Sequence, residues 1–200
     1  MKRIILTLVL SFLSFGAAQA ALIDRGDGFI YDSDQDITWT QDADINGLKN
    51  WYGQMAWADG YSQTHTVYGT FDDWRLATTL QPDPSCSGQS GGFSYNYDCT
   101  GSEMGHLFNV DGISGGSMGL FTNVQSNKYW SGTESTYLMT TAWYLDFSSG
   151  NQNTNDKLYS YGYAFAVRDG DIASVVPIPA AVYLFASGLG LLGWVRKKTN

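Results

Sequence analysis

Positive charge is scarce in this sequence away from its two ends. Lys and Arg number 11 and Asp and Glu number 19 among 200 residues, which gives a formal net charge of -8 at pH 7. Five of the basic residues stand close to the termini, so the rest of the chain sets six basic residues against all 19 acidic ones, a balance of −13. Nucleic-acid binding depends on Lys and Arg that neutralise phosphates, and this deficit argues against DNA or RNA as a partner.

Histidine, a frequent carrier of acid–base chemistry, is equally scarce. His65 and His106 are the only histidines, and each is better explained as a surface or core residue than as a general base. Two Gly-x-Ser-x-Gly strings, around Ser90 and Ser117, lack the hydrophobic strand and the helix that a nucleophile elbow requires. No catalytic residue is therefore predicted, although the 19 acidic residues leave open a hydrolase that uses two carboxylates.

Glycine and aromatic residues are abundant instead. Gly occupies 23 positions, and aromatic residues make up 15% of the chain. So many aromatic side chains supply ample surface to bury, which argues against disorder, while this much glycine would weaken the helices of a bundle. The length and an apolar content of 44% fit one ordinary globular domain with appendages, without internal repeats.

Residues 1–20 have the arrangement of a secretory signal peptide. Lys2 and Arg3 form a positive start, Ile4 to Phe15 form an apolar stretch, and Ala18-Gln19-Ala20 forms a small-residue cleavage site. We therefore expect this segment to be removed and the protein to be exported.

A second apolar run extends from Val175 to Val195 and ends in the basic tripeptide Arg196-Lys197-Lys198. Pro177 and Pro179 restrict its first turn, because proline lacks the amide donor of a helix interior. The remaining helix is slightly short for a permanent membrane span. The basic tail is expected to keep the C-terminus in the cytoplasm and the domain outside.

The string Val176-Pro177-Ile178-Pro179-Ala180-Ala181, with the apolar run and basic tail behind it, resembles the PEP-CTERM sorting signal in its V-P-x-P-A-A form. Ile178 stands where the namesake motif has glutamate. The resemblance implies that residues 175–195 anchor the chain transiently in the inner membrane. It also implies that exosortase, a membrane-embedded cysteine protease, processes the tail and leaves the protein at the bacterial cell surface or outside the cell. A plain tail anchor is the alternative.

Residues 21–174 remain as one domain, whose first half predicts a hairpin and a helix. Turn residues at Asp27-Gly28 and at 32–36 separate short runs at Phe29–Tyr31 and Ile37–Thr40, which read as strands. Apolar residues at the spacing of one helix face then follow, namely Leu48, Trp51, Tyr52 and Met55.

The second half predicts another helix and then strands. Thr100-Gly101-Ser102-Glu103 has the spacing of a capping box, and the apolar residues after it are Met104, Leu107 and Phe108. Strands are predicted at Lys128–Ser131, Ala142–Phe147 and Tyr161–Arg168, and Gly150 to Asp156 reads as a polar turn. Two short helices and several strands make an α+β domain.

Cys86 and Cys99 are the only cysteines, and an even count in an exported chain predicts a disulfide. The bond would close a loop rich in Ser, Gly and Tyr and would stabilise the fold by about 3 kcal/mol, because it restricts the unfolded chain. His106 is the only nearby residue that could join the cysteines in a metal site, which is too few ligands.

Five strings, in order along the chain, resemble the Lcl C-terminal domain family, long described as a domain of unknown function. The most specific is Phe71-Asp72-Asp73-Trp74-Arg75-Leu76-Ala77-Thr78, which is similar to the family's D-W-R-L-P-T signature with Ala77 in place of proline. The other four strings are Asp24–Trp39, Tyr129–Glu134 with Trp130, Ala142–Phe147 with Trp143, and Ala164–Arg168 with Arg168.

This resemblance implies a C-type-lectin-like fold, in which two short helices pack on twisted antiparallel sheets with long loops. It implies an extracellular recognition or matrix role and supplies no catalytic residue. The loop between Cys86 and Cys99 looks like an insertion before the second helix. Within the signature, we expect Trp74 to anchor the core and Arg75 to pair with Asp72 or Asp73.

Aspartates crowd the region from 24 to 44, and Asp32-x-Asp34-x-Asp36 begins like a calcium-binding loop. Ile37 and Ala43 replace the turn glycine and the bidentate glutamate, which excludes an EF-hand. The alternatives are a looser calcium site and a solvated turn whose aspartates cap backbone amides. Gln81-Pro82-Asp83 is similar to the galactose-type motif of calcium-dependent lectins, but its place in the chain favours a simple proline turn.

These patterns predict an exported cell-surface or matrix protein whose non-catalytic, lectin-like domain contacts extracellular polysaccharide or matrix protein. Exposed aromatic side chains would stack on sugar rings. An extracellular hydrolase that uses acidic residues and a purely structural matrix component are the alternatives.

Overall fold

The computed structural model describes residues 22–175 of the chain. The predicted signal peptide, residues 1–20, lies outside the described residues, as does the predicted sorting signal from residue 176 onward. Within residues 22–175, no helix is long and apolar enough to cross a membrane.

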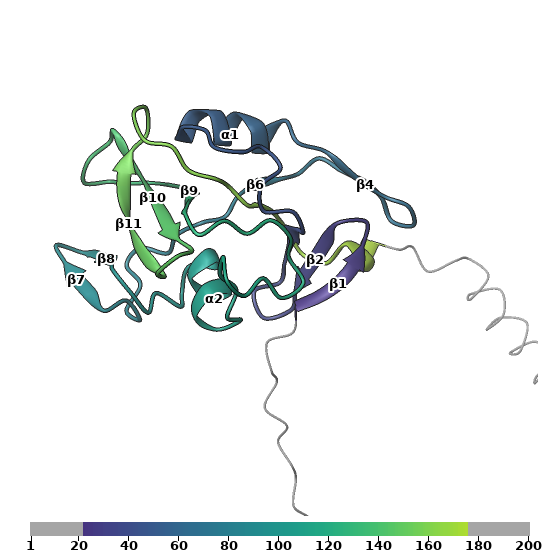
Figure 1. Ribbon diagram of the computed structural model, residues 1–200, viewed down its shortest axis with the longest axis horizontal. Helices are drawn as coiled ribbons and strands as arrows, with labels where there is room; N and C mark the ends of the chain where they lie inside the picture. The colour runs from purple at the N-terminus through teal and green to yellow at the C-terminus, as the bar shows by residue number, and fades with distance from the viewer. Residues whose placement is uncertain (1–21, 176–200) are drawn as a thin grey trace, which may run out of the picture.

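The described residues form mainly β-structure with two short α-helices (Figure 1). The elements are β1 (Leu22–Gly26), β2 (Phe29–Asp32), β3 (Ile37–Thr40), α1 (Trp51–Asp59), β4 (Gln63–His65), β5 (Gly69–Phe71), β6 (Arg75–Leu76), β7 (Gly88–Ser90), β8 (Phe93–Tyr95), α2 (Glu103–Asn109), β9 (Lys128–Glu134), β10 (Thr141–Asp146), β11 (Asn151–Asp156), β12 (Ala166–Asp169) and the 3₁₀ helix η1 (Ile172–Val175). This content confirms the predicted α+β class.

Strands from both ends of the described chain meet in one five-stranded antiparallel sheet, in the order β1-β2-β3-β12-β6. The β1–β2 turn falls at Asp27 and Gly28, whose positive φ angles of 50° and 86° are typical of a tight hairpin. Val167 of β12 pairs with Trp39 of β3 on one side and with Arg75 of β6 on the other. The sheet therefore joins the opening, signature and closing strings of the sequence.

A second antiparallel sheet has the order β11-β10-β9. β9 and β10 confirm the strands predicted at Lys128–Ser131 and Ala142–Phe147. The polar turn predicted at 150–156 is wrong, because β11 occupies Asn151–Asp156 and all its residues pair with β10. Pairing with a neighbouring strand outweighs the low β propensity of asparagine there. The strand predicted from Tyr161 begins only at Ala166.

The largest group of buried side chains joins both sheets and α2. Trp39 is fully buried, with the edges of Phe121 and Phe165 against it, and Tyr129 and Phe147 continue the cluster toward β9 and β10. A smaller cluster packs α1 onto β6 and β9. Hairpin β7–β8 lies beside β10 and β11 at one end of the domain, away from β1, β2 and η1 (Figure 1).

Helix α1 exists where the sequence predicts it, but only half of the expected apolar residues pack against the core. Leu48 precedes the N-cap residue Asn50 and is exposed, as is Tyr52 within the helix. The buried positions are Trp51, Gln54 and Ala58. The expected face is therefore right for Trp51 and for Met55, which packs partly buried against the same cluster, and wrong for Leu48 and Tyr52.

Helix α2 is confirmed, but the capping box is not. The N-cap is Ser102, not Thr100, and the Ser102 hydroxyl accepts a hydrogen bond from the Leu80 amide. The Glu103 carboxylate likewise leaves the helix and accepts a hydrogen bond from the Thr78 amide at 2.6 Å. The side chains of Ser102 and Glu103 therefore bond distant backbone amides and do not cap the helix. The apolar residues of the helix pack as predicted, with Met104 and Leu107 buried and Phe108 against the main core.

Candidate functional site

Asp73 and Arg168 form a two-pronged ion pair between the segment before β6 and strand β12. Nε and Nη2 of Arg168 donate to the two carboxylate oxygens of Asp73 at 2.8 and 2.9 Å. The guanidinium also lies 4.6 Å from the centre of the Phe71 ring. Hydrogen bonding from Arg168 lowers the pKa of Asp73. The pair ties together positions 95 residues apart, which is a structural role.

Arg75 does not pair with Asp72 or Asp73, so that expectation is wrong. Its guanidinium donates to both carboxylate oxygens of Glu103, at 2.9 and 2.8 Å, and to Asp169 at 2.6 Å. Pairing of β6 with β12 and packing of α2 bring these distant acids to Arg75, while Asp73 is already engaged. We call the residues of these ion pairs the ion-paired frame: Asp73, Arg75, Glu103, Arg168 and Asp169.

The tryptophans and Leu76 of the family-like strings lie in the interior. Trp74 is buried and its indole donates to the Phe71 carbonyl at 3.0 Å, which confirms its expected place in the core. Leu76 and Trp130 are buried together under α1. Trp143 differs, because it is 3% exposed and yet lines a cleft at the surface.

The aspartates of the 32–36 turn do not converge on one point. The buried Asp32 carboxylate accepts hydrogen bonds from the amides of Asp34 and Gln35 and from the Gln35 side chain. Asp36 accepts from the Tyr31 hydroxyl at 2.9 Å. The Asp32 contacts match the turn in which aspartates cap backbone amides, whereas Asp36 bonds a side-chain hydroxyl.

Two buried polar atoms near this turn have no hydrogen-bond partner within residues 22–175. They are Nε2 of His106 and Oδ2 of Asp111. The His106 nitrogen lies 4.0 Å from a carboxylate oxygen of Asp34, which is an ion-pair distance without a hydrogen bond. Burial, and after it the charge of Asp32, raises the pKa of Asp111 to about 6. This carboxyl therefore titrates close to neutral pH.

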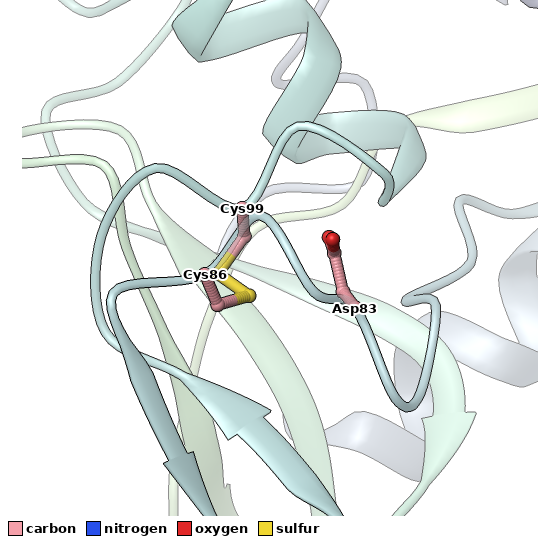
Figure 2. A group of neighbouring side chains, drawn as sticks. All are labelled: Asp83, Cys86 and Cys99. Atoms are coloured by element: carbon pink, nitrogen blue, oxygen red, sulfur yellow. A yellow bond between two sulfur atoms is a disulfide. The ribbon is translucent and has the colours of Figure 1, made fainter.

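Cys86 and Cys99 form the predicted disulfide, and Asp83 lies beside it (Figure 2). Within the described part of the chain, these three residues are the only group of His, Cys, Asp or Glu whose ligand atoms all lie within 4.8 Å of one another. The sulfurs are bonded to each other, and the buried Asp83 carboxylate accepts hydrogen bonds from Ser85 and from the Gly101 amide. We therefore assign no metal to this group.

Gln81 and Asp83 hold hairpin β7–β8 in place. The Gln81 side chain donates to the Ser94 carbonyl and accepts from the Ser94 amide, both at 2.8 Å. The Asp83 amide donates to the Ser94 hydroxyl at 2.9 Å. The string that is similar to a lectin motif thus has its side chains engaged within the protein and supports the disulfide loop.

A cleft of about 420 Å³ lies between hairpin β7–β8 and the β9–β11 sheet. Its volume falls within the range of small-molecule sites. Four of its side chains are aromatic and none carries a formal charge. The lining residues are Ser90, Gly91, Phe93, Tyr95, Ser135, Tyr137, Trp143, Asn153 and Thr154.

The cleft opens where hairpin β7–β8 separates from β11. Asn96 and Gln152 exchange backbone hydrogen bonds of 2.8 and 2.7 Å, so the chain after β8 starts as a neighbour of β11. The bridge is isolated, and the cleft lies where the pairing stops. Trp143 pairs with Thr154 across β10 and β11 and lines the sheet side of the cleft. Phe93 and Tyr137 meet edge to face from opposite walls, with ring centres 5.9 Å apart.

Asparagine side chains occupy backbone donors at the edge of β11 beside the cleft. The backbone N–H and C=O of Gln152 point away from β10 and bond the hairpin. Because these groups alternate in direction along a strand, the backbone N–H and C=O of Thr154 and Asp156 point away from β10 as well. The Asn153 side chain accepts from the Thr154 amide at 2.8 Å, and the Asn155 side chain accepts from the Asp156 amide at 3.0 Å. These two donors are therefore not offered to an added strand.

Sequence reasoning singled out only Trp143 and Ser90 among the cleft residues. Ser90 ends β7 and is followed by the turn at Gly91 and Gly92, so it lacks the helix of a nucleophile elbow. The overlooked signal is the alternation of Phe93, Ser94 and Tyr95 inside a disulfide-closed loop. In this loop Ser94 is buried while the rings of Phe93 and Tyr95 line the cleft, which is unlike a plain linker.

Comparison of the chain with models of known protein families, with curated proteins and with solved structures finds no match.

Proposed function

We propose that the described domain is a non-catalytic, lectin-like module that binds a saccharide in the cleft between hairpin β7–β8 and the β9–β11 sheet. The observation that carries this proposal is the lining: Phe93, Tyr95, Tyr137 and Trp143 stand among hydroxyl and amide groups, without formal charge. Aromatic faces offer broad apolar contact to sugar rings, while hydroxyls and amides exchange hydrogen bonds with sugar hydroxyls.

The lining favours binding over hydrolysis. Glycoside hydrolases place two carboxyl groups about 5–10 Å apart around the scissile bond. Among the described residues, those that line the cleft include no carboxylate and no imidazole. A bound saccharide would therefore be held without the acid and base that its cleavage requires.

The edge of β11 favours a saccharide over an extended peptide of a matrix protein. Peptides that bind beside a sheet usually add a strand through free backbone donors and acceptors. Asn153 and Asn155 already bond the outward amides of Thr154 and Asp156. Stacking and side-chain hydrogen bonds therefore dominate what this cleft offers.

The same proposal includes the fold family and the destination of the protein. We assign the α+β domain to the C-type-lectin-like arrangement that the Lcl C-terminal domain resemblance implies. Residues 1–20 would direct export, and residues 175–200 would direct exosortase-dependent sorting to the cell surface or matrix, where polysaccharide is at hand. The Cys86–Cys99 disulfide supports an oxidising compartment.

A glycan array with the purified protein tests the proposal. Tyr137→Ala and Tyr95→Ala remove rings that line the cleft, and each should lower binding of the best glycan by about tenfold, as loss of a stacking contact does. Tyr97→Ala is the matched control, because Tyr97 is exposed on the same disulfide-closed loop as Tyr95 and does not line the cleft. Blank arrays, or equal losses in all three variants, would contradict the proposal.

A further inference from the structure

A second hollow of about 250 Å³ lies next to the cleft, beyond the β9–β10 loop. Tyr137 of that loop lines the cleft, and Met139, two residues further, lines the second hollow. On β11, Thr154 likewise lines the cleft, and Asp156, two residues further, lines the second hollow. Alternate residues of a strand share one side and stand about 7 Å apart, so the two hollows follow one another along β11.

Three of the side chains that line the two hollows are unusually exposed. Tyr137, Met139 and Tyr159 are 82%, 81% and 81% exposed, more than any other large hydrophobic residue of the described chain. Tyr137 lines the cleft and the other two line the second hollow, together with the exposed Tyr52 of α1. Apolar groups gathered at one end of a protein in this way mark a binding surface.

The charged groups of the second hollow are occupied within the protein. Asp156 accepts hydrogen bonds from the amides of Leu158 and Tyr159, both at 2.8 Å. Lys157 is buried, bonds Glu134 and lies 4.9 Å from the centre of the Trp51 ring. A ligand therefore meets aromatic surface beside the Asp156 carboxylate, whose negative charge, like that of the acidic domain around it, repels polyanions.

Resting on the proposed function, we infer that the ligand is an uncharged, linear glycan chain that runs from the cleft past Tyr137 and Met139 into the second hollow. Successive sugar units would occupy the two hollows. Once one unit is bound, the linked unit is held close to the second hollow, so affinity rises with chain length. Without the five basic residues near the termini, six basic residues stand against 19 acidic ones, and this balance gives no attraction to an anionic membrane surface, which favours the glycan as the occupant.

Calorimetry with oligosaccharide series tests this inference. The probes are cello-, laminari- and chito-oligosaccharides from disaccharide to hexasaccharide, with alginate as the polyanion. For the series that binds, affinity should rise about tenfold or more with length, as expected when linked units fill two hollows. Tyr159→Ala should abolish this gain and leave disaccharide affinity within about twofold of the unmodified protein, since the cleft is untouched.

Tyr161→Ala is the matched control, because Tyr161 is exposed nearby and lines neither hollow. Equal affinity at all lengths, or a Tyr159→Ala protein that keeps the gain, would overturn the chain inference and leave the cleft proposal standing. Preference for alginate, or sedimentation with phosphatidylcholine vesicles that depends on Tyr159, would overturn the choice of ligand. Failure of every probe to bind would overturn both proposals.

Discussion

The ion-paired frame and the cleft are built by opposite means. The frame joins β6, β12 and α2 through carboxylate–guanidinium pairs between residues far apart in sequence, such as Asp73 and Arg168. One wall of the cleft is a short hairpin held by one disulfide, side chains such as Gln81 and a single backbone bridge to β11. The ion pairs thus maintain the architecture, while one wall of the candidate binding surface is the disulfide-closed hairpin β7–β8.

The largest expected effect comes from removing the disulfide. Replacing Cys86 and Cys99 together by alanine should lower the free energy of unfolding by about 3 kcal/mol, because the unfolded loop regains its freedom. Because the disulfide closes the base of the hairpin that forms one wall of the cleft, glycan binding should fall as well. Urea denaturation and calorimetry measure the two effects. Unchanged binding in the double variant would show that the hairpin does not depend on its disulfide.

Arg168→Ala should have the next largest effect, and it should lower the stability of the ion-paired frame without changing binding in the cleft. The change removes two hydrogen bonds to Asp73 and the packing on Phe71, and should cost about 2 kcal/mol of stability. Binding measured well below the melting temperature should stay as in the unmodified protein. Arg168→Lys should recover only part of the stability, since lysine cannot make the two-pronged contact. A selective loss of binding would contradict the division between frame and cleft.

Asp111→Asn should have a smaller, pH-dependent effect. Because burial raises the pKa of Asp111 in the folded protein to about 6, its stabilising contribution is present in acid and is lost as the pH rises through that value. The neutral variant should therefore be more stable than the unmodified protein near pH 8, by about 1 to 2 kcal/mol once the partial exposure of Asp111 is allowed for, with no difference near pH 3. Denaturant titrations at the two pH values measure this. A gain at acid pH instead would contradict the assignment.

Calcium should have the smallest effect. The carboxylates of Asp32 and Asp36 already accept hydrogen bonds within the turn, and no cluster with Asp34 is formed. Adding calcium or a chelator should change neither the melting temperature nor glycan binding. A calcium-dependent rise in melting temperature that Asp34→Ala removes would restore the looser calcium site.

Residue type and spacing in the sequence predicted the first hairpin turn, the second helix and the disulfide, which depend on residues near one another in the chain. The Asp27-Gly28 turn, the position of α2 and the pairing of Cys86 with Cys99 follow from residue type and spacing. The expected partners of Arg75 and the capping box were wrong because tertiary contacts supply closer partners than the chain neighbours. Long-range pairing decides such contacts, and no spacing reveals it.

The cleft could be predicted least. Its walls come from the disulfide-closed hairpin β7–β8, the β9–β10 loop and β11, and the last of these reads as a polar turn in the sequence. Only the register of β10 and β11 places Trp143 opposite Thr154 and opens the space beside Asn96. High aromatic content indicated sugar stacking in general, but which rings face the solvent depends on packing.

Hydrogen exchange with and without the best glycan of the array tests the central claim most directly. The account predicts slower exchange of backbone amides in residues 88–95, 135–143 and 152–159, which surround the two hollows, and no change in 71–76 or 166–169 of the frame. Protection confined to the frame segments, or absent from the hairpin and β11, would contradict it.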